Sequence, residues 1–144
     1  MGAVKLLFVV QRPPYKNENP RLALTHAIAS QTAEIYMDEG DSVVPTVVFV
    51  GDGVLNVIKG QQAMKLYGVT STESHIKNSL LIDMPIWVCK EDMERLGLKE
   101  DQMITDAEEL GAELKTKFVS FADIQKEMDS VKHLFISKTR LSYC

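Results

Sequence analysis

The stretch Met84–Gly97, MPIWVCKEDMERLG, predicts a short buried strand that ends at Cys89. We expect a short helix directly after this strand, with Gly97 at its end. The Cys89 thiol would then lie where the free backbone N–H groups of a helix begin, and these groups favour a thiolate over a thiol. The rest of the chain is expected to form the scaffold that presents this sulfur atom.

The composition is typical of one globular domain. The chain has 144 residues, of which 45% are hydrophobic and 25% charged, so it is long enough to bury a core. We expect a single domain over residues 1–137 and a polar tail over 138–144. No apolar run reaches the roughly 20 residues that span a bilayer. Two cysteines do not form a disulfide framework, and without an export signal they predict a cytoplasmic protein.

Strand patterns alternate with helix patterns along the chain. Apolar runs predict five strands, at 4–10, 45–50, 84–89, 113–119 and 131–137. Helical spacing predicts helices from Pro20 to just before Gly40 and at about 54–66, 70–81, 90–96 and 121–128. This alternation predicts an α/β fold, a single three-layer α/β/α domain with a mainly parallel five-stranded sheet.

Helix-start signals support several of these elements. Asn19 before Pro20 starts the first helix, and Ser120 can cap the last one. Capping boxes of Thr70 with Glu73 and of Thr105 with Glu108 predict a helix and a single helical turn. Gly60 weakens the helix at 54–66, and the pattern is compatible with a break there.

The carboxyl ends of parallel strands meet at one edge of a sheet, and ligands bind beyond that edge. Three loops are expected there: Gln11–Asn19, Gly51–Gly53 and Cys89–Lys90. We therefore predict a pocket beside the candidate catalytic residue Cys89. Its predicted lining residues are Arg12, Pro14, Tyr15, Asn19, Gly51, Asp52, Gly53 and Lys90.

Two interpretations of Cys89 are open at this point. It is either a reactive thiol or a small buried hydrophobic residue at a strand end. Lys90 would lower its pKa, whereas Glu91 and Asp92 would oppose that, so the net direction is undecided. Asp52 likewise is either a turn residue between two glycines or part of the pocket wall. Cys144, the last residue, is either inert or within reach of another sulfur.

The sequence does not show the residue patterns that other kinds of catalytic or cofactor site require. The histidines at 26, 75 and 133 are scattered and form neither a zinc pattern nor an evident pair with Cys89. The loop after the first strand lacks the glycines of a dinucleotide site and the Gly-Lys-Ser/Thr of a P-loop. A formal net charge of −4 without a basic block argues against direct nucleic-acid binding. We therefore expect no metal and no cofactor.

Three groups of residues, in this order, carry a resemblance to a known family. They are the first strand with its proline loop and Asn19–Leu24, the strand and turn Val48–Val54, and Val88-Cys89 followed by Arg95–Leu98. In these the chain resembles the DsrE/DsrF-like family of small sulfur-relay proteins, which includes the Tus subunits of bacterial tRNA thiolation. The resemblance covers roughly Lys5 to Ser137. The chain departs from it at Glu91 and Asp92, where family members often have small residues.

The resemblance implies a flavodoxin-like fold, oligomers that are often trimers or hexamers, and sulfur donor and acceptor proteins as partners. It implies that Cys89 carries sulfane sulfur as a persulfide, which makes the chain a sulfur carrier or sulfurtransferase. Thiol exchange needs access and a suitable pKa but no dedicated base. The alternative is a non-catalytic subunit of a homo-oligomer, or of a hetero-oligomer with sister subunits. A flavodoxin-like ligand binder is a third and weaker hypothesis.

Overall fold

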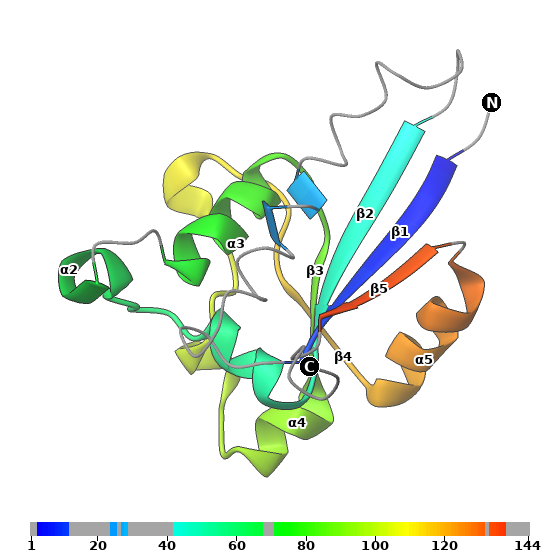
Figure 1. The fold of residues 1–144 in the computed structure, drawn as a ribbon. Helices are drawn as coiled ribbons and strands as arrows, with labels where there is room; N and C mark the ends of the chain where they lie inside the picture. Colours follow the sequence, from blue (N-terminus) through cyan, green and yellow to red (C-terminus); the bar gives the residue numbers. More distant parts are fainter. Residues whose placement is uncertain are drawn as a thin grey trace, which may run out of the picture.

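The computed structural model describes residues 3–11, 24–25, 27–28, 42–67, 71–131 and 133–137. Its centre is one five-stranded sheet in which every pair of neighbours is parallel. The strands are β1 (Ala3–Val10), β2 (Ser42–Phe49), β3 (Ile86–Cys89), β4 (Lys117–Val119) and β5 (His133–Ser137). Their order in the sheet is β4-β3-β2-β1-β5, and Figure 1 shows β2, β1 and β5 side by side.

The central strands are apolar because both of their faces are covered. Leu7 and Val10 of β1, Phe49 of β2 and Val88 of β3 are all completely buried, as expected for a parallel sheet with helices on both sides. The register pairs Val10 with Phe49 and Cys89 with Val119. The carboxyl ends of the strands therefore meet at one edge.

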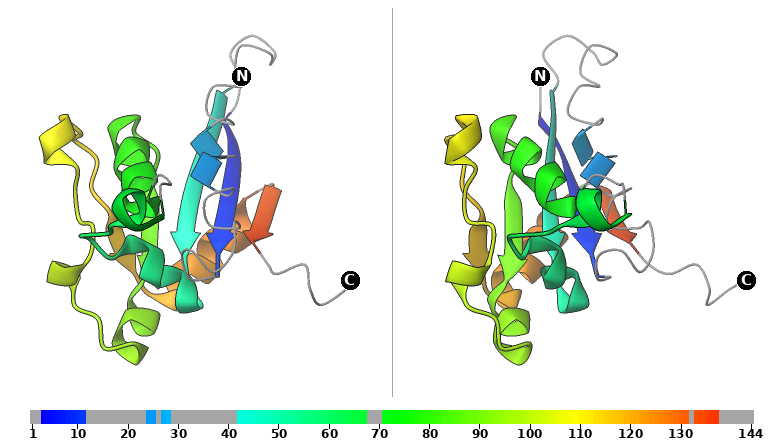
Figure 2. Two further views of the ribbon diagram at one scale, coloured as in Figure 1. Left: turned by 60° about the vertical axis from the view of Figure 1, so that its left-hand side comes forward. Right: turned by 90° about the vertical axis from the view of Figure 1, so that its left-hand side faces the viewer.

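Helices lie on both faces of the sheet, as Figure 2 shows. Besides the helical residues at 24–25 and 27–28, the helical elements are η2 (Gly51–Val57), α2 (Ala63–Tyr67), α3 (Thr72–Leu81), α4 (Lys90–Arg95), η3 (Glu100–Gln102), η4 (Glu108–Leu110) and α5 (Phe121–Ser130), where η marks a 3₁₀ helix. Since crossovers between parallel strands are right-handed, the steps from β2 through β4 run over one face. The return from β4 to β5 runs over the other face, where α5 lies.

The predicted fold class, a three-layer α/β/α domain with a parallel five-stranded sheet, is confirmed. The strand order differs from the 2-1-3-4-5 order of flavodoxin itself, because β1 pairs with β2 and β5. Leu24 and Ala27, within the helix predicted after the first strand, are helical and buried. The remainder of that helix and the tail at 138–144 lie outside the described residues.

The segment predicted as one helix over 54–66 consists of two pieces. η2 ends at Val57, and α2 begins at Ala63. Between them Gly60 has a φ of 83°, a conformation that ends regular helix. The Glu73 carboxylate accepts hydrogen bonds from the backbone N–H groups of Gly60 and Gln61 at 2.9–3.2 Å. The break at Gly60 is therefore part of the structure.

Several predicted element ends were wrong. The cap of α3 is Ser71, whose Oγ accepts a hydrogen bond from the Ser74 N–H, rather than Thr70 with Glu73. The turn η4 follows Ala107 instead of being capped by Thr105. Strand β4 begins at Lys117 rather than at residue 113. Ser120 caps α5 as predicted, and its Oγ accepts a hydrogen bond from the Asp123 N–H.

Candidate functional site

Cys89 is the last residue of β3 and the residue before α4. Its backbone is still extended, with φ −75° and ψ 119°. The side chain is only 1% exposed. The predicted position of this thiol, at the carboxyl edge of the sheet, agrees with the structure, but its neighbours cover it.

A crevice opens at this edge between β3 and β4. The chain after β3 runs on the α3 side of the sheet, where Met103 pairs with Ile58 and Glu109 Oε1 lies 2.7 Å from Lys77 Nζ. The chain after β4 instead enters α5 on the opposite face (Figure 2). Neighbouring strands therefore send their connections in opposite directions here, which is where open α/β sheets form ligand crevices.

A pocket of about 300 Å3 lies in this crevice, and Cys89, Glu91, Asp92 and Phe121 line it. Liquid water takes up about 30 Å3 per molecule, so the space admits a sulfur atom and the small group that delivers it. Phe121 is 51% exposed at the start of α5. The pocket walls thus combine a thiol, two carboxyl side chains and one aromatic ring.

The Glu91 carboxylate joins the two sides of the crevice. Its Oε1 accepts a hydrogen bond from the Cys89 thiol at 3.7 Å, and a second from the Phe121 backbone N–H at 2.9 Å. The second bond satisfies one of the free N–H groups at the start of α5. Glu91 therefore links the thiol at the end of β3 to the helix that follows β4.

The Asp92 carboxylate binds the turn after β2. Its Oδ2 accepts a hydrogen bond from the Gly51 N–H at 2.6 Å, and its Oδ1 lies 3.3 Å from Arg95 Nε. Arg95 Nη2 lies 3.5 Å from Asp52 Oδ1. Burial acts to raise the pKa of Asp92, but the Gly51 N–H, the Cys89 thiol and Arg95 outweigh it and hold that pKa below its usual value. Asp92 is therefore an ionised tie between α4 and η2.

Burial raises the pKa of the Cys89 thiol to about 11. The Asp92 carboxylate adds to this shift, since a nearby negative charge disfavours a thiolate, while the backbone N–H groups of Asp92 and Glu91 act in the opposite direction. The net shift of the Cys89 pKa, whose direction the sequence left undecided, is therefore upward. The helix after Cys89 has only six residues, and its N-terminus does not compensate for burial.

The glycine turn after β2 reaches this site through Asp92. Gly51 donates to the Asp92 carboxylate, and Asp52 is exposed and paired with Arg95. Gly53 is buried, and a Cβ there would lie 2.0 Å from the Val10 carbonyl oxygen. None of these three residues lines the pocket with Cys89. The predicted lining residues Arg12, Pro14, Tyr15 and Asn19 lie outside the described residues, as does Cys144.

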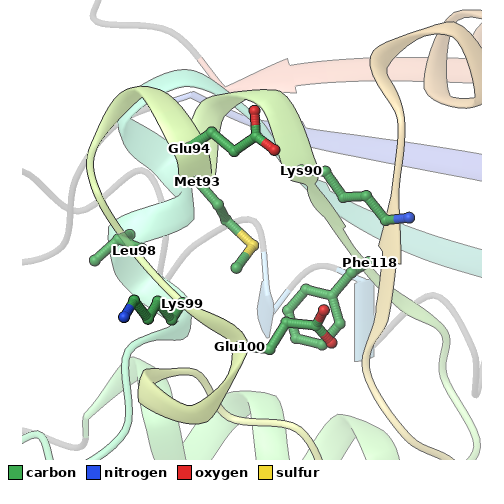
Figure 3. A pocket seen from close by; sticks show the side chains of 7 residues that line it. All are labelled: Lys90, Met93, Glu94, Leu98, Lys99, Glu100 and Phe118. Carbon is green, nitrogen blue, oxygen red and sulfur yellow. The ribbon is translucent and has the colours of Figure 1, made fainter.

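Lys90 lies on a different side of α4. It borders a second pocket of about 200 Å3, whose other lining residues are Met93, Glu94, Leu98, Lys99, Glu100 and Phe118. Figure 3 shows the Met93 and Phe118 side chains pointing into this space. Lys90 is therefore absent from the residues that line the Cys89 pocket, although it follows Cys89 directly.

Phe121 was not among the predicted site residues. The prediction that loops meet beyond the carboxyl ends of parallel strands was made for the first three strands but not for β4, whose last residue, Val119, pairs with Cys89. The same rule predicts that the residues after Val119 lie beside the thiol. Within the described ranges, no group of three or more His, Cys, Asp or Glu side chains could hold a metal ion. No helix in the described part of the chain has the length and apolarity to cross a membrane.

Comparison with solved structures agrees with the fold. The structures that match nearly the whole chain include the following two. The crystal structure of the YchN protein from E. coli has a TM-score of 0.71 at 15% identity, covering 92% of this chain and 98% of that one. The MTH1491 protein from Methanobacterium thermoautotrophicum, described as of unknown function, has a TM-score of 0.58 at 13% identity, covering 90% of this chain and 96% of that one. At these identities the two matches establish the fold.

A comparison with curated proteins finds no match. The family model that describes the DsrE/DsrF-like family matches residues 4–133, which include all of β1 to α5 except Ala3. The chain therefore belongs to the DsrE/DsrF-like family, and this membership supports a role connected with sulfur relay.

Proposed function

We propose that this protein is a sulfur carrier that accepts and donates sulfane sulfur as a persulfide on Cys89. The observation that carries the proposal is the position of Cys89: its thiol borders a pocket at the crevice between β3 and β4. Family membership supports the chemistry, and the crevice supplies the place for it.

The transfer moves one sulfane sulfur atom from a donor persulfide to Cys89. The Cys89 thiol loses its proton, and the resulting thiolate attacks the outer sulfur of a donor persulfide. A new S–S bond forms on Cys89 while the S–S bond of the donor breaks. The electron pair of that bond stays on the donor's inner sulfur, which leaves as a thiolate and takes up a proton. The reverse sequence passes the sulfur to an acceptor thiol.

The second candidate is a non-catalytic subunit, and the burial of Cys89 favours it. Cys89 is 1% exposed, and its pKa is about 11. With that pKa, about one thiol in ten thousand is ionised at pH 7. In the covered state the thiol is therefore unreactive, and a carrier has to uncover it during each transfer.

Intact mass spectrometry distinguishes the two candidates. We expect the protein to gain about 32 Da, one sulfur atom, after incubation with a protein persulfide donor, and to lose it on reduction. Cys144→Ser should gain the same mass, because the sulfur is carried on Cys89. Cys89→Ser should gain none. Equal uptake by Cys89→Ser and wild type would overturn the assignment, and no uptake by either would favour the non-catalytic subunit.

We propose sulfur donor and acceptor proteins as the partners, since members of this family act in complexes. An oligomer follows from the same membership, either homomeric or formed with sister subunits. The proposed compartment is the cytoplasm, where thiols stay reduced. The formal net charge of −4 supports a protein partner rather than direct contact with nucleic acid.

A further inference from the structure

Cys89 borders a pocket large enough for its chemistry and yet is 1% exposed. Something next to the sulfur therefore separates it from the open space. Within the described residues, the side chain that contacts both the sulfur and the far wall of the pocket is Glu91, with Oε1 3.7 Å from Cys89 Sγ and 2.9 Å from the Phe121 backbone nitrogen.

We propose that Glu91 is a latch that keeps Cys89 covered and protonated, and that its release from the sulfur permits transfer. The role of this latch in sulfur transfer rests on the function proposed above, but the latch itself is testable on the thiol alone. Glu91 does not exchange sulfur, so it is a positioning residue.

The two hydrogen bonds of Glu91 explain why the latch is stable when closed. A carboxylate oxygen accepts more than one hydrogen bond, so a single Oε1 holds both donors at once. The Phe121 N–H belongs to the first residue of a ten-residue helix, where the chain has a free donor and a partial positive charge. The start of α5 thereby anchors Glu91 over the sulfur.

Among the residues that the structure describes, those linked to the thiol include no cation that would counteract the latch. The charged groups linked to the thiol are Glu91 and Asp92 of α4, and Asp92 is itself paired with Arg95. Asp52 of η2 lies one step further, on Arg95. From β4 the neighbouring residue is the apolar Val119, and from α5 it is the Phe121 backbone and ring. Removing the charge of Glu91 should therefore make ionisation of the thiol easier.

The test is the rate at which the neutral reagent iodoacetamide alkylates Cys89, measured against pH in the Cys144→Ser background. Glu91→Gln keeps an oxygen that can accept the Phe121 N–H but removes the charge. Because a negative charge 3.7 Å from the sulfur is removed, we expect the thiol pKa to fall and alkylation at pH 8 to become about tenfold faster. Glu91→Ala also removes the cover and should react faster still.

The matched control is Glu94→Gln, an exposed glutamate on the same helix that borders the other pocket (Figure 3). It should react at the wild-type rate and with the wild-type pH profile. If Glu91→Gln is no faster than Glu94→Gln, or if its thiol pKa does not fall, the latch is wrong. The comparison of Glu91→Gln with Glu94→Gln tests the latch even if Glu91→Ala fails to fold, because the glutamine retains the hydrogen bond to α5.

This result is independent of the sulfur-uptake experiment. Fast alkylation of Glu91→Gln without sulfur uptake by wild type would support the latch and contradict the carrier. Sulfur uptake by wild type with equal alkylation rates in Glu91→Gln and Glu94→Gln would support the carrier and overturn the latch.

Discussion

Glu91 and Asp92 are neighbours in the first turn of α4, yet their carboxylates bind different parts of the molecule. Glu91 points to the thiol and the start of α5, whereas Asp92 points to Gly51 and Arg95. The family resemblance made these two residues look like an obstacle to a reactive thiol. In the structure each of them also has a structural role, because each accepts a hydrogen bond from the backbone N–H of another element.

Asp92→Asn tests the tie to Gly51. Because the folded-state pKa of Asp92 is lowered, its carboxylate stabilises the fold above the ordinary value of 3.8 and loses that effect as the pH falls through the folded pKa. We expect the variant to be about 1 kcal/mol less stable than wild type at pH 7 in urea unfolding. The difference should shrink as the pH falls below 3.8 through the folded-state pKa of Asp92.

The control for this prediction is Asp101→Asn, which removes an exposed carboxylate on η3. It should leave stability within about 0.5 kcal/mol of wild type across the same pH range. An Asp92→Asn deficit that does not shrink as the pH falls below 3.8 would show that the charge of Asp92 is not what holds the turn.

At the scale of elements, the contacts of η2 explain why this segment, whose spacing predicts a helix from residue 54, forms a short 3₁₀ helix instead. The chain leaves β2 at Val50, whose N–H donates to the Val10 carbonyl at 3.0 Å. Gly53 then lies against that same carbonyl. The buried Asn56 closes the turn by donating to the Gly53 carbonyl at 2.9 Å. Contact with β1, which is distant in sequence, sets the path of η2.

Gly53→Ala should therefore destabilise the protein. A Cβ at this position would lie 2.0 Å from the Val10 oxygen and 2.8 Å from its carbonyl carbon, so β1 or η2 has to move. We expect the free energy of unfolding to fall by about 1–3 kcal/mol, measured by thermal or urea unfolding.

Gly60→Ala provides the comparison. Its φ of +83° is unfavourable for alanine, but no atom lies within 4 Å of the added carbon. We expect a loss of about 1 kcal/mol there, from backbone strain alone. If both variants lose the same stability, close approach to Val10 is not the reason for glycine at position 53.

At the scale of the whole molecule, the proposed oligomer is tested by measuring the mass of the protein in solution. Light scattering of the purified protein should give a mass of three or six times 16.1 kDa if the assembly is homomeric. A mass of 16.1 kDa at micromolar concentration would contradict a homo-oligomer and favour assembly with sister subunits. The Cys89→Ser variant should assemble like wild type, because Cys89 is buried within the chain.

The sequence by itself determined the alternation of strands and helices, and with it the fold class and the place of Cys89 at a strand end. These features follow from local periodicity and from caps such as Ser120, which depend on residues a few positions apart. Because these signals are local, they predicted the ends of the elements less accurately than the elements themselves. The N–H of Thr116 donates to the carbonyl of Thr105, eleven residues earlier, and β4 begins only after this contact.

Only the tertiary structure decided the state of the thiol. It brings Phe121 to Cys89 because β4 lies beside β3, and it places Gly51 on Asp92 across 41 residues of sequence. Burial, which raises the Cys89 pKa to about 11, depends on tertiary packing. The residues next to Cys89 in the sequence therefore do not reveal it. The sequence located the sulfur; the order of the strands determined what covers it.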